Sequence, residues 1–177
     1  SVSSEQIGME KEKMQDGSNR TFWHSRFNPT VAEPPHFVII HNKKHEEIHG
    51  LSYSKWTGGN GNGQVKAYSV YLSDNKINWG KPVIEGKLDT LRSYEQKIIF
   101  PQKTTRPFIK FEVTDAVSLD GKSIASIGKL DVITSDNDPI LRSKISILSK
   151  SEKDLKRVIR NFAESAFSTD LANEDLL

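Results

Sequence analysis

Residues 16–27 of this chain read DGSNRTFWHSRF, and this stretch decides how the other segments are arranged. A polar turn containing glycine leads directly into two adjacent aromatic residues, and a histidine, an arginine and a third aromatic residue follow at once. Large aromatic side chains anchor a core, whereas histidine and arginine carry polar groups suited to recognition. The stretch therefore predicts a hinge where a buried anchor meets an exposed binding loop.

Strand patterns follow this hinge along most of the chain. Residues 64–73 alternate, with Tyr68, Val70 and Leu72 on one face, as expected of a half-buried strand. Residues 36–40 (HFVII) are apolar on both sides, which predicts a strand buried on both faces in the middle of a sheet. Further strands are predicted by the segments 48–53, 82–85, 95–100, 107–114 and 124–133. Short strands without intervening helices predict an antiparallel β-sandwich, and the separation of the first and last strands favours a jelly roll.

The two ends of the chain differ from this pattern. An opening strand is expected at the N-terminus, and residues 9–14 (MEKEKM) favour one or two helical turns. Residues 135–139 have the composition of a linker, and residues 151–154 (SEKD) resemble a capping box that opens an amphipathic helix. We therefore expect a β-sandwich over residues 1–134, a linker over 135–150 and a helical segment over 151–177. This segment either packs on the sandwich or begins a following domain, and the second alternative is favoured.

Composition excludes several classes of protein. The 177 residues include no cysteine, so a disulfide framework is ruled out, and the net charge is only +2. Lysine and arginine are mixed with aspartate and glutamate, so the basic stripe of a nucleic-acid-binding protein is missing. No apolar run approaches the roughly 20 residues that a membrane-spanning helix needs. Neither nucleic-acid binding nor membrane insertion is expected.

Several motifs, in the same order, resemble one known family. They are DGSNRTFWHS from residue 16, PHFVII from 35, IHGLSY from 48, VKAYSVYLSD from 65, NWG from 78, IKFEV from 109 and IASIGKLDV from 124. The chain is similar over residues 2–133 to the discoidin family, the coagulation factor V/VIII type C domain, and to its bacterial carbohydrate-binding modules. The resemblance implies a galactose-binding-like jelly roll of about eight strands, with loops at one end that hold a sugar.

Sugar-binding positions carry over from this resemblance only in part. The family's histidine and the aromatic residue three positions later fall on His24 and Phe27, which suit sugar hydroxyls and the C–H face of a pyranose respectively. The family's arginine is replaced by Lys55, which lacks the planar fork. Trp56 is expected to supply a second stacking surface and Arg26 the cation. Hydrogen bonds are expected from the neighbouring amides Asn60 and Asn62, while Ile124 stands where the family often has a last aromatic residue.

The structural calcium ion of the family is expected to be absent. Asp16 and Thr21 match two of its ligands, but the position of the acidic third ligand falls on Lys129. An ammonium cannot ligate calcium, although it can pair with the same carboxylate. We therefore predict that Lys129 pairs with Asp16 in place of the ion, and we expect no cofactor.

Residues 45–49 (HEEIH) match the H-E-x-x-H signature of zinc proteases. That chemistry needs a helix that brings both histidines to one face. A strand pattern precedes the motif, Gly50 follows it, and another strand begins at Ile48. The predicted structure is instead a polar turn between strands, with His45, Glu47 and His49 on a solvated face. No nucleophile, phosphate loop or carboxylate pair takes a catalytic position, so we expect no enzyme.

The sequence therefore predicts a non-catalytic carbohydrate-binding module of a larger, exported bacterial protein. Its partners would be a glycan or cell-surface polysaccharide and the neighbouring domains of the parent protein, outside the cytoplasm. The alternative is a protein-interaction, cell-envelope or spacer module that binds no sugar. Recognition of a membrane surface would need apolar loop tips, and only Trp56 is offered. A zinc enzyme rests on the HEEIH letters alone.

Overall fold

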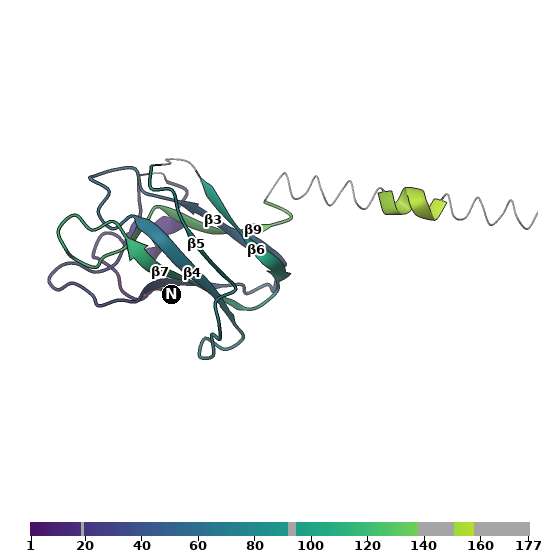
Figure 1. Cartoon of the computed structure of the whole chain (residues 1–177), viewed down its shortest axis with the longest axis horizontal. Helices are drawn as coiled ribbons and strands as arrows, with labels where there is room; N and C mark the ends of the chain where they lie inside the picture. Colours follow the sequence, from purple (N-terminus) through teal and green to yellow (C-terminus); the bar gives the residue numbers. More distant parts are fainter. Residues whose placement is uncertain (19, 92–94, 138–150, 158–177) are drawn as a thin grey trace, which may run out of the picture. The chain divides into compact units, whose positions relative to one another are not determined.

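A computed structural model describes residues 1–18, 20–91, 95–137 and 151–157 of the chain. Residue contacts divide the chain into one unit of Ser1–Thr134 and a second of Ser135–Leu177. The first unit is an antiparallel β-sandwich (Figure 1). Its elements are η1 (Lys11–Met14), β1 (Trp23–His24), β2 (His36–His41), β3 (Ile48–Ser54), β4 (Val65–Ser73), β5 (Ile84–Lys87), β6 (Gln96–Thr104), β7 (Phe108–Ala116), β8 (Ser126–Ile127) and β9 (Lys129–Thr134).

Three sheets share these strands. One sheet has the order β2-β7-β4-β5, a second has the order β6-β3-β9, and β1 pairs with β8 in a short ribbon. On the face of residues 64–73 that was predicted to be buried, Tyr68 and Val70 of β4 lie in the core; Ser69 of the other face is buried as well, and its hydroxyl donates to Glu85. Phe111 of β7 lies between the sheets, with ring centroids 5.4 Å from Tyr68 and 6.2 Å from Tyr53 of β3. The predicted antiparallel sandwich is therefore the observed fold.

The predicted position of residues 36–40 is wrong, because β2 is an edge strand. Its outward residues Phe37 and Ile39 are only half-buried. The first residues of the chain partly cover this edge: the Ser3 amide donates to Phe37 O at 3.0 Å and the Ile39 amide to Ser1 O at 2.6 Å. The expected opening strand is thus reduced to a single bridge between Val2 and Val38. A run apolar on both faces fits an edge strand when another segment covers it.

The predicted strand over residues 124–133 is interrupted at Gly128, which separates β8 from β9. A Cβ at this position would lie 2.7 Å from the backbone carbon of Lys55 and 2.8 Å from the Trp56 nitrogen. Only glycine leaves room for this crossing of two backbones. The interruption lets β8 pair with β1 while β9 pairs with β3.

The remaining predictions concern the two ends of the chain and the edge of the second sheet. The helical turn expected within residues 9–14 is η1, a 3-10 helix. The predicted strand over 95–100 extends to Thr104 as β6, and its Pro101 is tolerated because β6 is an edge strand. Residues 151–157 are α-helical, as the capping box predicts. The expectations for 138–150 and 158–177 lie outside the described residues.

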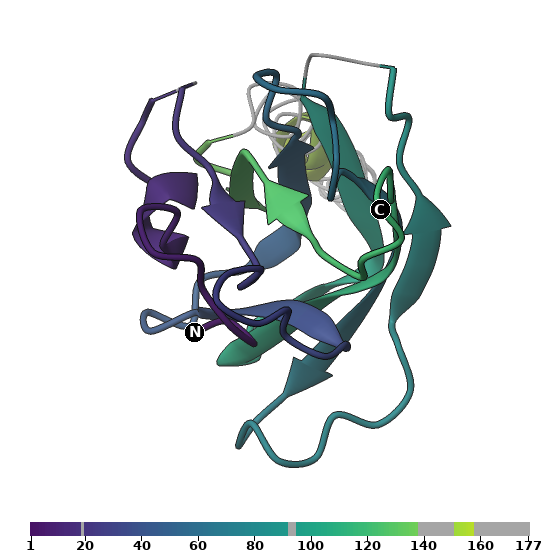
Figure 2. The same cartoon turned by 90° about the vertical axis from the view of Figure 1, so that its left-hand side faces the viewer.

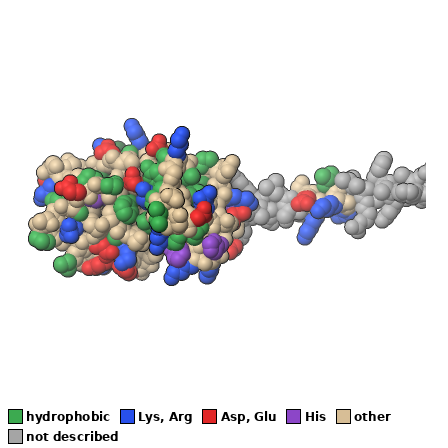
Figure 3. Space-filling view, turned by 90° about the horizontal axis from the view of Figure 1, so that it is seen from below, with side chains coloured by type: hydrophobic (Ala, Val, Ile, Leu, Met, Phe, Trp, Pro, Cys, Tyr) green, Lys and Arg blue, Asp and Glu red, His purple; other side chains and the backbone are tan. Residues whose placement is uncertain are grey.

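No helix within the described residues is long and apolar enough to cross a membrane. Figure 3 views the sandwich from below and shows lysine and arginine side chains interspersed with aspartate and glutamate on that face.

Candidate functional site

One end of the sandwich brings together β1, β8 and the loop between β3 and β4. Figure 2 looks onto this end, where β1 and β8 lie side by side. Their register places His24 opposite Ser126. Trp23, the anchor predicted for this stretch, is completely buried. The predicted hinge is therefore confirmed at its core side, and we call the surface around His24 the β1 rim.

His24 is held in a defined tautomer. Its Nδ1 lies 2.6 Å from the carbonyl oxygen of Ser25, so Nδ1 must carry the proton that is donated. In the neutral ring Nε2 is then an acceptor, and no described residue donates to it. Burial lowers the pKa of His24 below its ordinary value, although the bond to Ser25 acts in the opposite direction. At neutral pH the imidazole is therefore uncharged and offers Nε2 as an acceptor.

An aromatic cluster surrounds this imidazole. The Phe27 ring meets the His24 ring edge-on, with centroids 4.8 Å apart, and Phe22 approaches it at 6.3 Å. Phe22 in turn stacks on Trp56, with centroids 3.9 Å apart and an interplanar angle of 14°. The structure therefore brings the predicted His24, Phe27 and Trp56 together, linked by Phe22.

Trp56 does not present a free face. Phe22 covers one side of the indole, and a Cβ on either Gly58 or Gly59 would overlap its six-membered ring. The backbone of the glycine-rich loop therefore lies against Trp56, which is half-buried. Sequence reasoning assigned this residue a stacking role, but its contacts are those of a support for the rim.

The predicted amide groups take different roles. Asn62 fastens its loop to the one after β7, because Oδ1 accepts from the Leu119 amide at 2.9 Å and Nδ2 donates to Asp120 Oδ1 at 3.2 Å. Asn60 Oδ1 accepts from the Asn62 amide at 3.1 Å within a turn. The Asn60 side chain therefore keeps its Nδ2 group without a described partner, whereas Asn62 is engaged through both its oxygen and its nitrogen.

The two predicted cations, Lys55 and Arg26, also take different roles. Lys55 Nζ donates to the carbonyl oxygen of Thr90, in the connection between β5 and β6. Arg26 is exposed, and its Nε donates to Thr30 O at 3.3 Å. Arg26 thus retains the two terminal nitrogens of its guanidinium for a ligand, whereas Lys55 is tied to a neighbouring loop.

Two residues that support the site were not predicted. The buried Gln6 accepts hydrogen bonds through Oε1 from the amides of Phe27 and Asn28, both at 2.9 Å. Ser25 Oγ accepts from the Ala125 amide at 2.9 Å. These bonds join residues about 20 and 100 positions apart, so no local pattern in the sequence could have indicated them.

A second cluster of polar groups surrounds Asp16, in the segment just before β1. Lys129 Nζ is 2.8 Å from Asp16 Oδ1, so the predicted pair is present. The same carboxylate accepts from the Thr21 hydroxyl at 2.6 Å, and the carbonyl oxygens of Lys13 and Ser18 lie 3.4 and 3.3 Å from that hydroxyl. Lys129, followed by Thr21, holds the pKa of Asp16 well below its usual range. The four oxygen-bearing residues would suit a hard cation, but the ammonium already meets the carboxylate, so the residues present do not fit calcium.

The HEEIH segment spans the end of the connection between β2 and β3 and the start of β3, so it lies between strands, as predicted, and is not a helix. His45 Nδ1 lies 3.2 Å from Thr105 O, and His49 lies in β3. The solvated face predicted for His49 is wrong: its side chain is only 15% exposed and its Nε2 is 3.2 Å from Glu47 Oε1. Among the described residues, no three histidine, aspartate or glutamate side chains gather as a metal site would require.

Comparison with known proteins identifies the family. Residues 1–130 match the model of the F5/8 type C domain. The chain belongs to this family. A galactose oxidase of Gibberella zeae is 35% identical to this F5/8 type C domain over 127 residues, which are 70% of the chain and 18% of the relative. A sialidase of Micromonospora viridifaciens is 29% identical over 118 residues, or 66% of the chain and 18% of the relative. The chain thus spans less than a fifth of the length of either.

Solved structures show the same fold. A family 32 carbohydrate-binding module of Clostridium perfringens NanJ, solved with galactose, superposes with a TM-score of 0.62 at 23% identity, covering 75% of this chain and 90% of that one. Another module from the same organism, solved with GalNAc-β-1,3-galactose, gives a TM-score of 0.58 at 25% identity, covering 76% and 93%. The F5/8 type C domain described here therefore has the galactose-binding-like sandwich of these modules.

Proposed function

We propose that residues 1–134 form a non-catalytic carbohydrate-binding module that binds glycans ending in galactose or N-acetylgalactosamine. The observation that carries the proposal is the free Nε2 acceptor of His24 beside the ring of Phe27. A sugar hydroxyl would donate to Nε2 while the C–H face of the pyranose packs on Phe27. Arg26 and Asn60 would complete the polar contacts. The ligands named for the two Clostridium perfringens modules support this choice of sugar.

The parent protein extends the proposal. The relatives are enzymes of which this domain matches 18%, which supports a larger exported protein whose activity lies in other domains. Residues 135–150 would then be a linker, and residues 151–157, which are helical, would begin the next domain. The partners would be a glycan outside the cytoplasm and the neighbouring domains of the parent.

The binding test uses calorimetric titration with a β-galactoside such as lactose. Few atoms make contact in a shallow site, so we expect about −4 to −6 kcal/mol, which corresponds to high micromolar to millimolar dissociation constants. His24→Ala and Phe27→Ala should each weaken binding about tenfold or more, because each removes a principal contact. His41→Ala, which changes an exposed histidine of β2, is the matched control and should bind as the wild type does.

A second candidate function is an interaction or spacer module without a sugar ligand. Its support is that Trp56 is covered on both faces and that Asn62 and Lys55 are engaged within the domain. Absence of heat with lactose and of any hit on a glycan array would favour this alternative over the first.

A further inference from the structure

A groove opens at the end of the sandwich opposite the β1 rim. The rim adjoins the start of β4 near Gly63, whereas Leu72, near the end of β4, lines the groove. Other walls come from the loop between β4 and β5 and from the end of β6. The volume is about 710 Å³, within the range of small-molecule sites. Its size exceeds what a simple inorganic anion would fill.

One wall of this groove is apolar. Trp79 is half-buried there, and Leu72, Val83 and Pro101 accompany it. Lys110 Nζ lies 5.3 Å from the centre of the Trp79 ring, which holds the indole against the outer side of β7. An indole flanked by aliphatic groups is a surface on which the C–H face of a pyranose packs.

The other walls are polar and basic. Lys81, Lys103 and Arg106 line the groove, and the side-chain amides of Asn78 and Gln102 line it as well. No aspartate or glutamate is among the described lining residues. Amide groups match the hydroxyls of a sugar, and the basic groups match a carboxylate.

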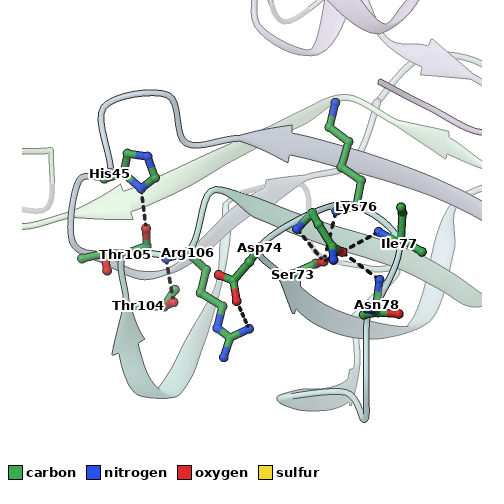
Figure 4. Close-up of polar contacts among 10 residues, drawn as sticks. His45, Ser73, Asp74, Lys76, Ile77, Asn78, Thr104, Thr105 and Arg106 are labelled. Carbon is green, nitrogen blue, oxygen red and sulfur yellow. Dashed lines mark hydrogen bonds and ion pairs between the residues drawn. The ribbon is translucent and has the colours of Figure 1, made fainter.

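Two of these cations have acidic neighbours outside the groove. Lys103 Nζ is 2.7 Å from Glu47 Oε2. Arg106 Nη1 is 3.0 Å from Asp74 Oδ2, and Figure 4 shows this second pair. All four side chains are more than two-fifths exposed, so water weakens both pairs. Lys81 makes no ion pair with any residue in the described part of the chain. The three cations carry one more charge than the two neighbouring carboxylates, Glu47 and Asp74, so the net charge at the groove is positive.

Arg106 also retains donors. Only Nη1 meets Asp74, so Nε and Nη2 have no described acceptor. A guanidinium can bind a second carboxylate through these nitrogens without losing the first contact.

We propose that this groove binds an acidic saccharide, with a uronate carboxylate between Lys81 and Arg106 and the sugar ring against Trp79. The inference does not rest on the function proposed for the β1 rim, because the two sites share no residue. It assigns the domain a second, charge-selective site.

The test is calorimetric titration of the whole chain with trigalacturonic acid and with its methyl ester, which removes the charge and keeps the rings. We expect the acid to bind at least tenfold more tightly than the ester, and we expect rising salt to weaken only the acid. Lys81→Gln should weaken binding of the acid about threefold, and Lys81→Gln with Arg106→Gln tenfold or more. The matched control Lys66→Gln changes an exposed lysine of β4 that pairs with Asp115 outside the groove, and it should bind as the wild type does.

Thermal unfolding of each variant shows whether it folds. If the double variant does not fold, the test depends on Lys81→Gln alone. Three results would each overturn the proposal: equal affinity for acid and ester, no binding up to about 10 mM, or unchanged affinity in Lys81→Gln. Loss of uronate binding in His24→Ala instead would assign the acid to the β1 rim and refute a second site. Lactose binding measured in parallel reports separately on the rim.

Discussion

At the scale of single residues, the tautomer of His24 sets the pH range of the proposed sugar site. The bond from Nδ1 to Ser25 O leaves Nε2 as the acceptor only while the ring is neutral. Burial places its pKa below 6.5, so protonation should begin only in acid solution. We expect lactose affinity to be highest where the ring is neutral and to fall as the pH drops into the acid range.

Titration calorimetry across this range checks the prediction. Phe27→Leu provides the control, because it should bind more weakly with the same pH profile. An affinity that increased on acidification would show that the charged imidazole, and not the neutral one, meets the ligand.

Residue-scale patterns predicted the side chains of the rim better than their contacts. The resemblance to the family paired His24 with Phe27, and the two rings do meet, because both lie in one short segment. The covering of Trp56 could not be predicted, since it depends on Phe22, which precedes β1, and on the path of a glycine-rich loop. Exposure of an aromatic residue in a flexible sequence is decided by tertiary packing.

At the scale of elements, the interruption at Gly128 lets the chain pass from β8 in the β1 rim to β9 in the second sheet. Gly128→Ala would bring a methyl group against the backbone at Lys55, which cannot move without disturbing β3. We expect a loss of about 1–3 kcal/mol in the free energy of unfolding and weaker lactose binding, because β8 positions His24.

Chemical denaturation measures the change in stability. Ser52→Ala in the middle of β3 is the control, and it should change stability far less. If Gly128→Ala unfolds at the same denaturant concentration as the wild type, the crossing of the two backbones is not the reason for glycine there.

Element types were predictable because alternation along β4 and β7 is a local property, whereas the neighbours of each strand were not. The HFVII run predicted a central strand, but β2 lies at the edge, where residues 1–3 supply part of the missing coverage. Apolar residues on both faces of a strand indicate that the strand is covered, but they do not reveal which segment covers it.

At the scale of the whole domain, the pair of Lys129 and Asp16 joins residues 113 positions apart. The lowered pKa of Asp16 means that the pair stabilises the fold above the ordinary carboxyl pKa of 3.8 and that this contribution is lost as the pH falls. Lys129→Glu should unfold at a lower temperature than the wild type without calcium. It should recover when calcium is added, because a second carboxylate then joins the oxygens of Asp16, Thr21, Lys13 and Ser18.

Thermal unfolding with calcium and with EDTA makes the comparison. The wild type should be insensitive to both, and Lys66→Glu should gain no response to calcium. Stabilisation of the wild type by calcium would contradict the prediction that the ammonium of Lys129 takes the place of the ion.

Lys129 is part of the polypeptide, whereas a bound ion exchanges with its surroundings. Polymers rich in carboxylates sequester divalent ions, and a domain fastened by such an ion would loosen on the surfaces they coat. Here the segment before β1 is joined to β9 by the side chains of Asp16 and Lys129 themselves, so the connection persists wherever the free ion is scarce.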